Sequence, residues 1–144
     1  DQLYKNKVID EMFSDQPALM EFLRYIDKSV SNEMTKEVTI QLMCIFYTAF
    51  VSQNVKFRKI DFDEMLTLVS KTAEMKKYLH NPNHTFDGKA FGKFVEQYPQ
   101  KEILNYTHFA LNNQFNLLVT SEREALFIFY IMKIFGEALD ATTV

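Results

Sequence analysis

Glycine, proline and cysteine are all rare in this sequence of 144 residues, and tryptophan is absent. Three glycines and three prolines are few for a chain with many tight β-turns, so their scarcity favours helices joined by polar loops. The single cysteine, Cys44, excludes an intramolecular disulfide and favours a cytoplasmic location. No signal peptide opens the chain, although a start at Asp1 is also what the removal of an upstream segment would leave.

Sequence motifs of the common enzyme classes are also missing. The chain has no Gly-rich phosphate loop, no Gly-x-Ser-x-Gly elbow and no Cys-x2-Cys pair. Cys44 lies in an apolar run, where burial raises the pKa of a thiol and suppresses the thiolate needed for nucleophilic attack. We therefore expect neither an enzyme nor a bound cofactor.

Two of the three histidines lie on either side of a proline. His80 and His84 flank Pro82, so they cannot share one helix face as the zinc ligands of a His-Glu-x-x-His motif do. Together with Asp87 they could form a metal site in a loop. Loop histidines are more often simply solvated, and the sequence therefore predicts no metal.

Apolar residues recur at helical spacing along nearly the whole chain. A short helix is expected to end near residue 14, and the helix that follows from Pro17 has a clear apolar face. Further helices are expected over about 34–52, 61–79, 87–98, 103–110 and 121–139.

Two of these predicted helices have no polar side, because residues 42–47 and 125–132 are unbroken apolar runs. A helix that is apolar all round is buried all round. The sequence therefore predicts an all-α fold: a compact bundle of six or seven helices in one domain over residues 1–144, with two fully apolar helices at its centre. Neither run reaches the roughly 20 residues that cross a bilayer, so no membrane span is expected.

Two helix starts carry the pattern of a capping box, in which a side chain at each of two positions satisfies backbone N–H groups. The pairs are Asp61 with Glu64 and Ser121 with Glu124. The helix after Asp61 also has a single apolar stripe, which we expect to face the core: Phe62, Met65, Leu66, Val69 and Ala73.

The excess of apolar helix surface suggests a protein partner. If the shorter helices do not cover the two apolar ones, a second copy or another protein must do so. We therefore expect a non-catalytic protein-interaction or regulatory module, which could self-associate as a homodimer. Its predicted partner-binding residues lie around the last helix: Phe127, Tyr130, Ile131 and Ile134.

One alternative is a carrier or sensor of a small apolar ligand. The chain has 14 phenylalanines and seven tyrosines, and helical bundles can hold apolar ligands between their helices. Met43, Phe46, Phe129 and Met132 are the residues expected to line such a pocket. Plain core packing explains the same residues equally simply.

The other alternative is a regulator that binds an anionic partner through the basic middle third. Residues 54–99 contain eight basic and six acidic side chains, and this excess is small for nucleic-acid binding, which is therefore disfavoured. The candidate contact residues are Lys56, Arg58, Lys59, Lys76 and Lys77.

Overall fold

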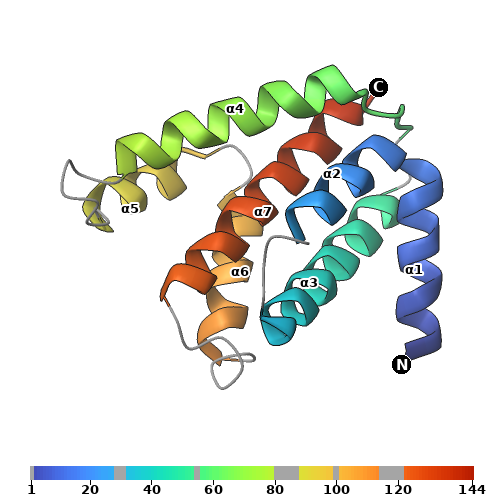
Figure 1. The fold of residues 1–144 in the computed structure, drawn as a ribbon, viewed down its shortest axis with the longest axis horizontal. Helices are drawn as coiled ribbons and strands as arrows, with labels where there is room; N and C mark the ends of the chain where they lie inside the picture. The colour runs from blue at the N-terminus through green and yellow to red at the C-terminus, as the bar shows by residue number, and fades with distance from the viewer. Residues whose placement is uncertain (1, 28–31, 54–55, 80–87, 99–100, 114–121) are drawn as a thin grey trace.

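The computed structural model describes residues 2–27, 32–53, 56–79, 88–98, 101–113 and 122–144. Over these residues the chain forms an all-α bundle of seven helices, and each helix lies where the apolar spacing predicts one (Figure 1). The helices are α1 (Gln2–Asp15), α2 (Pro17–Asp27), α3 (Glu33–Ser52), α4 (Phe62–Leu79), α5 (Gly88–Gln97), α6 (Lys101–Asn113) and α7 (Glu122–Thr142).

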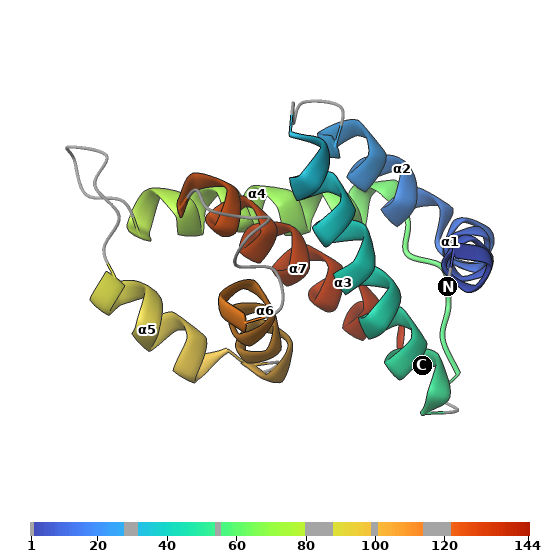
Figure 2. The same ribbon diagram turned by 90° about the horizontal axis from the view of Figure 1, so that it is seen from below.

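The last helix, α7, lies at the centre of the bundle. It contacts α2, α3, α4 and α6, and Figure 2 shows α7 running between α4 and α3. Its residues from 128 to 136 are all buried, which confirms the prediction that this apolar helix is covered on every side over that stretch. The cover comes from the other helices of the same chain.

The second apolar helix, α3, is covered only in part. Val38 and Leu42, four residues apart, are buried, and so are Met43 and Tyr47, again four apart, in a helix that packs against α1 and α7. On the same helix, Ile45 and Val51 are 42% and 40% exposed. α3 therefore buries only part of its apolar surface.

The fourth helix, α4, buries only part of the apolar stripe that its sequence predicts. Met65 of the stripe is buried and Val69 packs against the core, whereas Phe62 and Leu66 are 57% and 45% exposed, and Ala73 is exposed as well. Thr72, outside the stripe, is buried instead. The prediction of an inward apolar stripe is therefore wrong for these three exposed residues. The physical reason is a polar partner in the core, because Thr72 on α4 contacts a buried lysine on α7.

That buried lysine, Lys133, belongs to a hydrogen-bonded group between α4 and α7. Its ammonium lies 2.8 Å from Glu137 Oε1 and donates to Thr72 Oγ1 at 3.1 Å. Tyr98, which follows α5, donates its hydroxyl to the Lys133 carbonyl at 3.3 Å. Burial raises the pKa of Tyr98, and the nearby Glu137 carboxylate raises it further, so the hydroxyl keeps its proton.

The extended segment before α4 is held by the side chain of a buried glutamine, Gln16, at the junction of α1 and α2. Its Nε2 donates to the Arg58 carbonyl at 2.9 Å, and its Oε1 accepts from the Ile60 N–H at 3.0 Å. On its other edge the segment pairs with the end of α7, where the Arg58 N–H donates to the Thr142 carbonyl at 2.8 Å. One amide side chain thus takes the place of a neighbouring strand.

The capping box predicted at the start of α4 is confirmed. The Glu64 N–H donates to Asp61 Oδ1 at 2.8 Å, and the Asp61 N–H donates to Glu64 Oε1 at 3.2 Å. Glu64 also receives two hydrogen bonds of 2.7 Å from the Arg58 guanidinium. These contacts lower the pKa of Glu64 from 4.5 to about 2, chiefly through the hydrogen bonds from Arg58.

The start of α3 has a cap that also reaches α7. Asn32 accepts from the Met34 N–H at 2.9 Å and donates to Glu124 Oε1 at 2.6 Å. The second predicted capping box pairs Glu124 with Ser121, which lies outside the described residues. The hydrogen bond from Asn32 to Glu124 therefore links the start of α3 to the first turn of α7.

Candidate protein-binding groove

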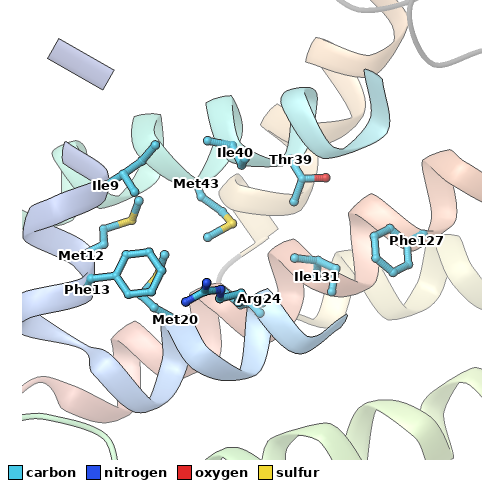
Figure 3. A pocket seen from close by; sticks show the side chains of 11 residues that line it. Ile9, Met12, Phe13, Met20, Arg24, Thr39, Ile40, Met43, Phe127 and Ile131 are labelled. Carbon is cyan, nitrogen blue, oxygen red and sulfur yellow. The ribbon is translucent and has the colours of Figure 1, made fainter. Parts of the chain in front are cut away.

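An apolar groove of about 180 Å³ opens between α1, α2 and α3, with α7 as its floor (Figure 3). Residues at helical spacing form its walls: Ile9, Met12 and Phe13 on α1, and Met20, Leu23 and Arg24 on α2. α3 and α7 complete the groove with Thr39, Ile40, Met43, Phe127 and Ile131.

The polar character of the groove is concentrated in one side chain at its rim. Among the described residues, Arg24 is the only charged one that lines it, and the guanidinium lies 3.7 Å from Glu21, one turn earlier on α2. The hydroxyl of Thr39 donates to the Thr35 carbonyl at 2.7 Å, so its hydrogen is satisfied within α3. The groove is therefore an apolar surface with a single exposed cation beside it.

Three of the lining residues are methionines: Met12, Met20 and Met43. Their unbranched, polarisable side chains adapt to partners of different shape, and methionine is used widely at surfaces that bind more than one sequence. Figure 3 shows the three chains directed toward the space between α1, α2 and α3. The lining is thus suited to adjust around an inserted side chain.

The four residues predicted to bind a partner do not form one exposed surface. Ile131 lies in the floor of the groove, Phe127 is half-buried beside it, and Ile134 is buried elsewhere in the core. Tyr130 is also buried, with the ammonium of Lys76 over its ring at 4.6 Å from the centroid. The chain's own helices thus cover much of α7 at these positions, and two of the four residues line the groove.

The five predicted contacts for an anionic partner lie near the two ends of α4. Lys56, Arg58 and Lys59 precede the helix, whereas Lys76 and Lys77 stand in its last turn. An 18-residue helix is about 27 Å long, so the two groups are far apart. Arg58 is already paired with Glu64, and burial lowers the pKa of Lys76. The structure does not bring these cations together into one patch.

The residues predicted to line a small-ligand pocket separate in the structure. Met43 lines the groove, whereas Met132 is fully buried away from it. Phe46 packs edge-on against Tyr106, with ring centroids 5.5 Å apart, and Phe129 lies beside a histidine on α6. Three of these four residues are therefore involved in packing rather than in lining the groove.

The described residues give no support to the candidates for a nucleophile or a metal site. Burial raises the pKa of the Cys44 thiol, as the sequence indicates. His80, His84 and Asp87 lie outside the described residues. Within the ranges that the structure describes, no group of three or more His, Cys, Asp or Glu side chains is placed to hold a metal ion. Nor does any described helix have the length and apolar character to cross a membrane.

Arg24 and Ile40 are the groove residues that the sequence gives least reason to select. Each lies at the edge of an apolar face, where a helical pattern cannot distinguish a wall of a groove from the margin of a core. The usable signal was the recurrence of apolar residues on the first three helices. Only the packing of these three helices shows that their apolar faces are not completely covered.

No family model, curated protein or solved structure matches this chain.

Proposed function

We propose that this protein is a non-catalytic interaction module, and that it binds an amphipathic helix of a protein partner in the groove between α1, α2 and α3. The observation that carries the proposal is an open apolar groove in whose lining, over the part of the chain that the structure describes, Arg24 is the one charged residue. Helix-in-groove recognition uses such a surface, because apolar side chains on one face of the bound helix insert into it.

The volume of the groove favours a partner side chain over a whole small ligand. Pockets that enclose drug-sized ligands measure roughly 300–1,000 Å³. At about 180 Å³ this groove is smaller, and its size suits one or two inserted apolar side chains. For this groove, carriage of a small apolar molecule is therefore the less favoured function.

The rim defines the charge that the partner should present. An acidic residue on the bound helix, within one turn of its apolar anchors, would face the Arg24 guanidinium and compete with Glu21 for it. The partner expected here is consequently an apolar helix face flanked by a carboxylate. Because the pair would be exposed, it would contribute more to specificity and orientation than to affinity.

The separation of the basic residues makes a nucleic-acid regulator a weaker proposal. Phosphate binding depends on several cations acting on one stretch of backbone, whereas Lys59 precedes an 18-residue helix and Lys77 stands in the last turn of that helix. The uncharged lining of the groove away from Arg24 is also the opposite of what a phosphate backbone requires.

A selection experiment with a matched pair of variants tests the groove. A displayed library of amphipathic helical peptides is selected against the wild-type protein, and the selected peptides are titrated against Ile40→Glu and Ile45→Glu. Both isoleucines are on α3, but only Ile40 lines the groove, while Ile45 is 42% exposed outside it. We expect peptides with apolar anchors and an acidic flank, and at least a tenfold loss of affinity in Ile40→Glu alone.

Equal binding to the two variants would place the peptides elsewhere on the protein and contradict the proposal. A selection that yields no wild-type binder would contradict it too. Circular dichroism and thermal unfolding of both variants establish that the introduced glutamate has not unfolded α3, so that the comparison reports on the groove itself.

A further inference from the structure

The first turns of α4 form an exposed apolar ridge, which we define by Phe62 and Leu66. These side chains are four residues apart, so they lie one above the other on the same helix face. They are 57% and 45% exposed, because α4 presents Met65 and Thr72 to the core instead. Asp63, also exposed, lies beside the ridge three residues before Leu66. The ridge is thus an apolar helix face flanked by a carboxylate.

We propose that the ridge of one copy of this protein binds in the groove of a second copy. The inference rests on the proposed function of the groove and names its partner as the chain itself. The ridge supplies the two features that the groove selects: apolar side chains at helical spacing, and an acidic group that can face Arg24. A groove of about 180 Å³ has the size for one or two such side chains.

The two surfaces consist of different residues, and this bears on the kind of assembly. The ridge lies on α4, whereas the groove is lined by residues of α1, α2, α3 and α7. A contact of one ridge with one groove is heterologous, and in an arrangement that does not close it leaves a free ridge on one copy and a free groove on the other. Copies are therefore expected to add one after another as concentration rises.

The contact is expected to be weak. Two anchor side chains and one exposed ion pair form a surface at the low end of protein interfaces, where complexes are transient. Sedimentation velocity over a series from micromolar to millimolar protein measures such an association. The weight-average mass of the wild type should rise continuously from the monomer value of 17.0 kDa and pass twice that value at the highest concentrations.

Two variants separate the surfaces. Leu66→Glu removes an anchor from the ridge and leaves the groove intact, whereas Ile40→Glu places a charge in the groove and leaves the ridge intact. Each variant alone should stay at the monomer mass. An equimolar mixture should form one-to-one complexes and nothing larger, because it holds one functional ridge and one functional groove. Ile45→Glu, at a similarly exposed position outside both surfaces, should behave as wild type.

Exchange of the charges supplies a second measurement that does not depend on apolar contacts. Arg24→Glu and Asp63→Arg should each weaken association several-fold, and the double variant should recover it in part. A wild type that remains monomeric throughout the series overturns the inference, as does association that persists in Leu66→Glu. If the selected helical peptides still bind in the groove of such a monomer, the proposed function stands and only the second copy is rejected; if they do not, both proposals are overturned.

Discussion

The two sides of α7 are built in different ways. On the side that faces α4, a buried charge is matched by named partners: Lys133 contacts both Glu137 and Thr72. On the side that faces α1, α2 and α3, Phe127 and Ile131 border an apolar groove that the chain leaves unfilled. We refer to these as the closed side and the open side of the bundle.

The comparison indicates which side determines the fold. A buried charge is tolerated only where its partners are in place, so the closed side accepts one register of α4 on α7 and penalises others. Apolar contacts on the open side have no such directionality, and their side chains can adjust to an added partner. We therefore infer that stability depends on the closed side and that binding depends on the open side.

The largest effect is expected on the closed side, from Lys133→Ala. Removing the ammonium leaves the Glu137 carboxylate, whose side chain is 24% exposed, without its ion-pair partner, and it leaves a cavity beside Thr72. Breaking a buried pair in this way should lower the free energy of unfolding by about 3 kcal/mol. Urea denaturation of the variant measures the loss.

The double variant Lys133→Met with Glu137→Leu tests the reason for that loss. It replaces both charges by apolar side chains of similar size, and Thr72 keeps its own hydrogen bond to the Leu68 carbonyl at 2.9 Å. Its stability should therefore lie much nearer to the wild type than that of the single variant. A double variant as unstable as Lys133→Ala would show that packing volume, and not the unpaired carboxylate, accounts for the effect.

A smaller effect is expected from Gln16→Ala, which removes the side chain that holds the segment before α4. The substitution leaves the Arg58 carbonyl and the N–H of the buried Ile60 without their partner. The free energy of unfolding should fall by about 2 kcal/mol, since two backbone groups lose their hydrogen bonds at once. Gln97→Ala, at an exposed position, is the matched control in thermal unfolding and should leave the melting temperature unchanged. Equal melting temperatures of the two variants would show that the hydrogen bonds of Gln16 do not stabilise the fold.

The smallest effect on the closed side is the pH dependence that Glu64 contributes. Its pKa is lowered from 4.5 to about 2 in the folded protein, first of all by the hydrogen bonds from Arg58. A lowered pKa means that the contribution to stability is complete above pH 4.5 and disappears as the pH falls toward 2. Because the pair is exposed, the contribution is small and decreases with salt.

Glu64→Gln checks this dependence by comparing urea midpoints at pH 7 and pH 3. Glutamine can keep the capping hydrogen bond to the Asp61 N–H but has no charge to lose. The midpoint of the variant should therefore change less between the two pH values than that of the wild type. An unchanged pH dependence would mean that other carboxylates account for the acid sensitivity.

The helices themselves could be predicted from the sequence because their signals are local. The apolar spacing located all seven described helices, and the pair Asp61 and Glu64 marked the start of α4. The rotation of α4 could not be predicted in this way. Its apolar stripe and its buried face differ because Thr72 pairs with Lys133, 61 residues away, and a helical pattern contains no information about such a partner.

The candidate site is harder to locate from the sequence than the fold. Of the four residues expected around the last helix to contact a partner, Phe127 and Ile131 line the groove, whereas Tyr130 and Ile134 are buried. An apolar residue produces the same sequence pattern whether its side chain faces a neighbouring helix or an unfilled groove. Only the packing of α1, α2 and α3 shows which faces remain incomplete.

The central position of α7 also has a consequence for the order in which the protein acquires its structure. A ribosome delivers residues 2–121 before the helix around which α2, α3, α4 and α6 are arranged. Until α7 emerges, side chains such as Val38, Leu42 and Met65 have no centre to pack against and remain open to other chains. Folding of the bundle during synthesis is therefore expected to wait until α7 has emerged from the ribosome.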